Sequence, residues 1–193
     1  MTALIIFVVI VAISAFWLIS AYNRLIALKG QTANAWKQID IQLKRRHDLI
    51  PNLISAAKGA MQFEKQTLES VVSARSAAIS ASASGSPETA SKVAAAEGVL
   101  TAALGRFLAV VEAYPDLKAT GNIGQLQEEL ASTEDKVAFA RQAYNDTATI
   151  YNISQSQFPT VLVAGLAGAS KAELWEITEE ADKAVPTVDL TMK

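Results

Sequence analysis

The stretch QIDIQLKRRHDLIPNL, residues 38–53, decides the fold because its apolar side chains recur every three or four residues. That spacing is typical of one face of an α-helix and does not match the alternation of a β-strand. The same period predicts one long helix over residues 22–83, with Pro51 inside it. Proline removes one backbone hydrogen bond, so the helix can bend there.

The composition excludes several classes of site. The chain has 193 residues, a net charge of −2, one histidine and no cysteine. A charge near zero argues against nucleic acid as the main partner, because phosphate binding needs a basic field. Without cysteine there is no disulfide framework, thiolate metal site or lipoprotein anchor. Half of the residues are apolar and strand-like alternation is nearly absent after the first segment, so we predict an all-α protein.

The first segment, ALIIFVVIVAISAFWLISA (residues 3–21), has no charged residue. About 20 apolar residues are enough to cross a bilayer as a helix. The alternative, a cleaved signal peptide, fits less well, because no Lys or Arg precedes the run and no clear cleavage site follows it. We therefore expect residues 1–22 to be a transmembrane anchor.

Basic residues follow the anchor, the nearest being Arg24 and Lys29, and none precede it. The positive-inside rule then predicts a single-pass membrane protein with its large domain in the cytoplasm, and the family resemblance described below implies that the membrane is the bacterial inner membrane. The periplasm is the alternative.

Glycine and proline divide the rest of the chain. Gly85 marks a turn, and Ser86 and Pro87 should start a second helix over residues 87–113. A third helix should begin at Asn122 and fade before residue 158. The prediction is an elongated antiparallel bundle of three long helices over residues 23–157. The C-terminal segment, residues 158–193, should hold a short helix around 171–179 and an extended tail.

The expected helix lengths leave one apolar stripe uncovered. At 1.5 Å per residue, the first helix would be on the order of 90 Å long and the second only about 40 Å. The uncovered residues would be Trp36, Ile39, Leu43 and Ile50. Either the first helix folds back, the tail covers the stripe, or another subunit does. Because a bare apolar stripe marks an interaction surface, these four residues are candidate partner-binding residues.

The basic residues Lys44, Arg45 and Arg46 have two readings. They could bind anionic lipid, as basic clusters beside a membrane do. They could instead form a solvated helix face, with Lys44 paired to Asp40 or Asp48 and Arg46 to an acid across the bundle.

No arrangement of residues indicates catalysis. His47 has no second histidine or cysteine to share a metal, and pairs such as Glu128–Glu129 are adjacent on a helix and cannot face each other. The sequence has no nucleophile elbow, Walker loop or Rossmann loop. We expect no enzyme activity, no catalytic residue, no bound metal and no cofactor.

Asn145 and Asn152 lie seven residues apart, each directly after a tyrosine. The repeat keeps helical register. It indicates either a polar recognition stripe or hydrogen bonds that fix the register of packed helices.

Two motifs, AWKQIDIQLKRRHDLIPNL (residues 35–53) and FPTVLVAGLAG (residues 158–168), resemble the LemA family. The resemblance covers nearly the whole chain. It implies a bacterial protein with one membrane span and a helical bundle, and it carries no assigned catalytic residues. The segment AGASKAELWEI departs from the family, which often has a Phe-rich stretch there.

The residues and the resemblance together predict a membrane-anchored helical scaffold that assembles protein partners without catalysis. The resemblance implies a membrane protease or a TPM-domain protein as partner, and self-association is a further alternative. The second functional hypothesis is an anionic-lipid-binding or membrane-shaping protein that uses residues 44–46.

Overall fold

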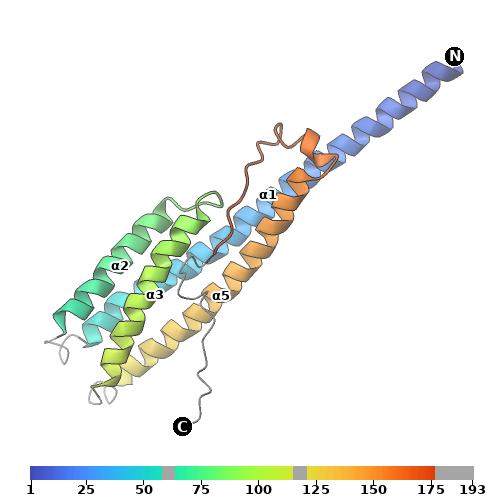
Figure 1. Ribbon diagram of the computed structural model, residues 1–193. Coiled ribbons are helices and arrows are strands. Elements are labelled where there is room, and N and C mark those ends of the chain that lie inside the picture. Colours follow the sequence, from blue (N-terminus) through green and yellow to red (C-terminus); the bar gives the residue numbers. More distant parts are fainter. Residues whose placement is uncertain (58–63, 115–120, 177–193) are drawn as a thin grey trace, which may run out of the picture.

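Helices make up the regular secondary structure of the part described by the computed structural model, residues 1–57, 64–114 and 121–176. Figure 1 shows their arrangement. They are α1 (Thr2–Ala57), α2 (Lys65–Ala83), α3 (Ala90–Glu112), α5 (Gly121–Ser156) and the short 3₁₀ helix η1 (Thr160–Leu162).

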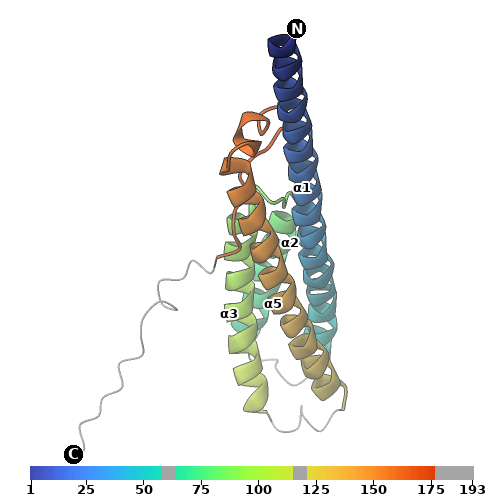
Figure 2. The same ribbon diagram turned by 90° about the vertical axis from the view of Figure 1, so that its right-hand side faces the viewer.

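α1 is a single helix with two different environments. Its first third projects from the bundle as a bare rod (Figures 1 and 2), and the apolar side chains there are exposed. Beyond that, buried side chains recur mostly at intervals of three or four residues, as in a coiled-coil seam. They are Ala21, Leu25, Thr32, Trp36, Ile39, Leu43, Arg46, His47, Ile50, Leu53 and Ala57.

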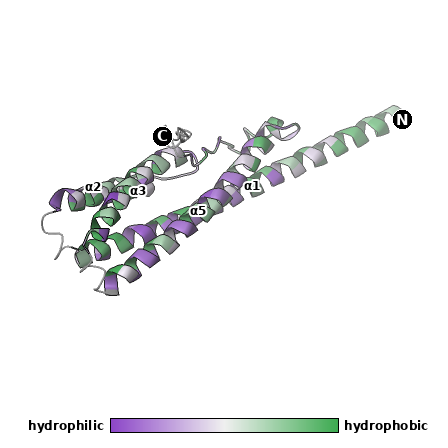
Figure 3. Ribbon diagram, turned by 60° about the horizontal axis from the view of Figure 1, so that its bottom comes forward, coloured by the Kyte–Doolittle hydropathy of each residue, from purple (hydrophilic) through white to green (hydrophobic). Residues whose placement is uncertain are grey.

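The four α-helices alternate in direction and pack as a bundle (Figure 2). α5 runs antiparallel to α1 along most of the bundle, with the Thr32 hydroxyl facing the Thr147 carbonyl at 3.4 Å, and α2 packs against α3. The prediction of an all-α antiparallel bundle behind a long apolar helix is confirmed. Figure 3 shows the hydropathy change along α1, from the apolar N-terminal part to a mixed surface within the bundle.

The first predicted helix, residues 22–83, is two helices. α1 ends at Ala57 and α2 begins at Lys65 and folds back alongside the bundle. The helical period could not reveal this break, because Val71, Ala74 and Ala78 of α2 face the same core as the end of α1. Residues 58–63 lie outside the described part.

Two smaller predictions also need correction. Ser86 and Pro87 do not start α3: they belong to a turn in which the Ser86 backbone N–H donates to the Thr89 hydroxyl at 3.0 Å. Gly85 in the same turn approaches the Trp36 ring so closely that an added Cβ would lie 3.0 Å from it. The predicted short helix at 171–179 is absent from its described part, residues 171–176, which is extended.

The core has two apolar clusters along the bundle axis. One lies at the end far from the projecting rod, around Leu53, Phe107 and Ile123. The other lies nearer to the rod, around Trp36, Tyr144 and Trp175. A group of charged side chains lies between them.

Candidate functional site

A buried charge cluster, which we define as Arg46, His47, Glu97 and Glu134, links three helices. Arg46 and His47 come from α1, Glu97 from α3 and Glu134 from α5. The first three are only 3–4% exposed. Such residues are rarely so buried unless they are paired, because removing a charge from water is costly.

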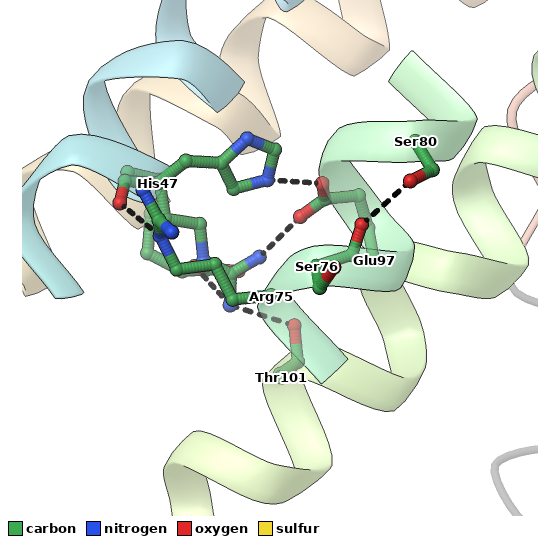
Figure 4. A network of polar contacts seen from close by, with 8 residues as sticks. His47, Arg75, Ser76, Ser80, Glu97 and Thr101 are labelled. Atoms are coloured by element: carbon green, nitrogen blue, oxygen red, sulfur yellow. Dashed lines mark hydrogen bonds and ion pairs between the residues drawn. The ribbon is translucent and has the colours of Figure 1, made fainter. Parts of the chain in front are cut away.

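The Arg46 guanidinium is held by three groups. Nη1 lies 3.1 Å from Glu97 Oε2, and Nη2 lies 3.0 Å from Glu134 Oε2. Nη2 also donates to the Thr101 hydroxyl at 2.8 Å. His47 Nε2 lies 2.7 Å from the other oxygen of Glu97, so this one carboxylate joins two neighbouring residues of α1 to α3. Figure 4 shows these contacts between α1 and α3.

Pro51 leaves one backbone carbonyl beside this cluster, and α2 binds it. In a regular helix the carbonyl of His47 would accept from the N–H of residue 51, but proline has no N–H. Arg75 of α2 supplies the missing donor: its Nε lies 2.7 Å from the His47 carbonyl oxygen (Figure 4). The helix therefore continues through Pro51 to Ala57, and the unpaired carbonyl becomes a contact between helices.

The basic residues 44–46 separate into two groups. Arg46 is buried, and the prediction that it finds an acid across the bundle is confirmed by Glu97 and Glu134. Its assignment to lipid binding is corrected accordingly, because its guanidinium faces the interior. Lys44 and Arg45 are exposed. The expected pairs of Lys44 with Asp40 or Asp48 are not among the ion pairs of the described residues.

The apolar stripe predicted to bind a partner is covered by the chain itself. Ile39, Leu43 and Ile50 are at most 1% exposed, and Trp36 is 8% exposed. Trp36 packs edge-on against Tyr144 of α5, with ring centroids 5.3 Å apart, and against Trp175 at 6.0 Å. The stripe therefore has partners within the chain, as the alternative of cover by the tail allowed in part: α3, α5 and the C-terminal segment pack around its first three residues, and α2 and α3 pack around Ile50.

Asn145 and Asn152 hold that C-terminal segment, which we call the strap (residues 169–176). The Asn152 amide donates to the Ala172 carbonyl at 2.7 Å and accepts from its N–H at 3.0 Å. Asn145 makes the same pair of bonds with Trp175, at 3.1 and 2.8 Å. Each asparagine thus binds one residue's backbone as a neighbouring β-strand would.

The spacing of the two asparagines fits an extended peptide. Seven helical residues span about 10.5 Å, and three extended residues span about 10 Å. The strap therefore stays extended because α5 offers amide groups at its repeat. The two asparagines therefore bind the backbone of an extended segment of the same chain, and not a packed helix as the register-fixing alternative expected.

Tyr144 adds a third contact to the strap. Its hydroxyl donates toward the Glu173 carbonyl at 2.6 Å, and the Glu173 N–H donates to the Pro87 carbonyl at 2.7 Å. Burial raises the pKa of Tyr144 above its ordinary value, so the hydroxyl keeps its proton and remains a donor. Sequence reasoning did not identify Glu97, Arg75 or the strap as parts of a site, because their partners are distant in the chain.

A shallow groove of about 540 Å³ lies beside the cluster, between α1 and the α2–α3 turn. Trp36 and His47 line it together with two lysines and two aspartates, so its charges balance. Within residues 1–57, 64–114 and 121–176, no group of three or more His, Asp or Glu side chains could hold a metal ion. The contacts of the charge cluster favour a structural role, in which they hold the helices together.

The fold and these contacts define a class: an all-α bundle carried on an apolar N-terminal helix. The LemA family model matches residues 35–190, and the chain belongs to the LemA family. It is 23% identical to magnetosome protein MamQ 1 and MamQ 2 of Paramagnetospirillum magneticum, over 90% of this chain and 71% of each relative. It is 27% identical to protein LemA of Metamycoplasma hominis, over 82% of this chain and 70% of that protein. The protein is therefore a membrane-associated bacterial protein.

We expect Glu97→Gln to lower the free energy of unfolding by roughly 3–5 kcal/mol, because it leaves Arg46 buried with less compensating charge. Denaturant unfolding of the detergent-solubilised protein, followed by circular dichroism, measures this loss. The matched control is Glu134→Gln, whose carboxylate is 41% exposed and should contribute less than about 1 kcal/mol. Equal losses in the two variants would contradict the assignment.

Asn152→Ala should release the strap while leaving the bundle folded. Losing two hydrogen bonds to Ala172 should raise the exchange rate of the strap amides roughly tenfold. Hydrogen–deuterium exchange with mass spectrometry resolves this segment, and Gln142→Ala on the exposed face of α5 is the control. Unchanged protection of the strap in Asn152→Ala would show that the asparagine does not hold it.

Proposed function

We propose that this protein is a single-pass scaffold of the bacterial inner membrane that holds protein partners beside the bilayer and catalyses no reaction. One observation carries the proposal: α1 continues without a break from an apolar segment with no buried residues into the centre of the bundle. Such a helix fixes the bundle at the membrane as one rigid body. The relatives named MamQ and LemA support membrane association.

α1 is the helix that we place in the membrane. α3 is also long and apolar enough, but 39% of its apolar window is buried, and its buried residues belong to the core of the bundle. Arg24 and Lys29 follow the apolar part of α1, which supports a cytoplasmic bundle.

The scaffold hypothesis needs a different contact surface from the buried stripe. Phe139, Ile150 and Ile153 of α5 are 73%, 51% and 51% exposed. Separated by 11 and 3 residues, they share one face of the helix, and we call them the α5 stripe. Ile150 and Ile153 lie toward the membrane end of the bundle. This position favours a partner that is itself membrane-bound, such as the membrane protease or TPM-domain protein implied by the family resemblance.

The lipid-binding alternative is less well supported. The Arg46 guanidinium is bound to Glu97 inside the bundle and does not face lipid. Lys44 lies 23 residues beyond Ala21 on a continuous helix, or about 35 Å away. That distance is several Debye lengths at physiological salt, so attraction to lipid headgroups would be weak.

A photo-crosslinking amino acid at Ile150 in the native cell tests the scaffold. We expect a covalent adduct with a membrane protein, because the side chain is exposed on the proposed contact face. Ser132, an exposed polar position on the same helix, is the matched control and should give no adduct. Recovery of only uncrosslinked monomer from both Ile150 and Phe139 would overturn the proposal. An adduct of two copies of this chain would identify the partner as a second copy.

A further inference from the structure

The segment after α5 exposes a group of large apolar side chains. Residues 157–170 contain no charged residue. Within them, four side chains are 49–81% exposed, and we call them the apolar tip: Phe158, Val161, Leu162 and Leu166. Large apolar side chains exposed together on one loop indicate a surface that contacts a protein or a membrane.

The apolar tip lies beside the part of α1 that the anchor hypothesis places in lipid. The Phe158 ring packs edge-on against Trp17, with centroids 6.0 Å apart. Trp17 precedes Arg24 by seven residues, so it lies about 10 Å nearer to the N-terminus than the first charge. The loop lies beside α1 (Figure 1), next to a part of that helix whose apolar side chains are also exposed.

The other end of the loop returns toward the polar side. The Lys29 ammonium donates to the Gly168 carbonyl at 2.7 Å. Lys29 is 12 residues beyond Trp17, or about 18 Å along α1. The loop therefore runs from an apolar level near Trp17 to a charged level near Lys29, as a segment crossing a membrane interface would.

Part of the loop backbone bonds to itself. Backbone N–H groups of Val161, Leu162 and Val163 donate to the carbonyls of Gln157, Pro159 and Thr160 at 2.8–3.1 Å. Ala167, Gly168 and Ala169 donate in the same way to carbonyls three to five residues earlier. Internal pairing matters because hydrocarbon offers no partner for a polar backbone group. This pairing lowers the cost of bringing the loop to the edge of a bilayer, where the remaining polar groups can still meet water or headgroups.

We propose that the apolar tip inserts into the same leaflet that surrounds the bundle end of α1, where it contacts lipid acyl chains. The inference rests on the proposed function only in taking α1 as the membrane span. The bundle would then have two membrane contacts, the α1 rod and the tip. Together they fix both its distance from the bilayer and its rotation about α1.

Fluorescent labels on single cysteines test this insertion, because the chain has no cysteine of its own. The full chain is reconstituted in phosphatidylcholine vesicles with the label at Leu166→Cys. Ile13→Cys is the control inside the anchor, and Ile41→Cys is the matched exposed apolar control on the bundle, 55% exposed. Quenching by doxyl-labelled lipid reports contact with acyl chains, and quenching by iodide reports contact with water.

At Leu166 we expect blue-shifted emission, quenching by doxyl lipid and protection from iodide, as at Ile13. At Ile41 we expect the reverse. If Leu166 behaves like Ile41 while Ile13 is lipid-exposed, the insertion is refuted and the anchor stands. If Ile13 is itself quenched by iodide, the anchor fails and the insertion with it. Protection of Leu166 from both quenchers would show that protein covers the tip, which also overturns the proposal.

Discussion

The structure depends on one constraint: α1 is a single helix whose two parts lie in different environments, one outside the bundle and one inside it. Its N-terminal third offers apolar side chains to its surroundings, and the rest offers a heptad-spaced seam to the other helices of the bundle. A helix can do both because its backbone hydrogen bonds are internal along the apolar segment, where hydrocarbon would offer no other partner. The helices packed on α1 therefore have a fixed distance from the apolar segment and a fixed orientation relative to it.

The middle of the bundle shows how this rod is locked to its neighbours. Pro51 leaves the His47 carbonyl free, and Arg75 of α2 uses it. Glu97 of α3 binds Arg46 and His47 together. These contacts are directional, in contrast to the apolar clusters on either side, so they depend on the rotation of α1 about its axis. A buried charged network is expensive to maintain and adds specificity more than stability.

The sequence predicted the class of fold because helical periodicity and an uncharged apolar run are local signals. It could not locate the break after Ala57, because the apolar period of α2 continues that of α1. It could not predict the strap either: residues 169–176 are extended only because Asn145 and Asn152 bind their backbone, and that pairing joins segments about 20–30 residues apart.

The candidate sites were predictable to a similar extent. The Tyr-Asn repeat indicated polar contacts along α5 but could not show whether they join two helices or bind an extended segment, whereas the prediction that Arg46 finds an acid across the bundle is confirmed. The identity of that acid was not accessible, because Glu97 looks like any other helix-face glutamate until α3 is packed on α1. The apolar stripe from Trp36 to Ile50 was predicted to be a free surface because the first helix was expected to continue to residue 83. The chain instead turns back after Ala57, so the later helices pack further along α1 than predicted.

The rigidity of α1 across its two environments is the central claim, and a distance measured across the boundary tests it most directly. Spin labels at Ser20→Cys and Arg45→Cys both lie on exposed positions of α1. Double electron–electron resonance on the full chain in vesicles should give one narrow distribution near 38 Å, the span of about 25 helical residues. A broad distribution, or one centred well below that distance, would show a hinge between the apolar segment and the bundle and would contradict the account.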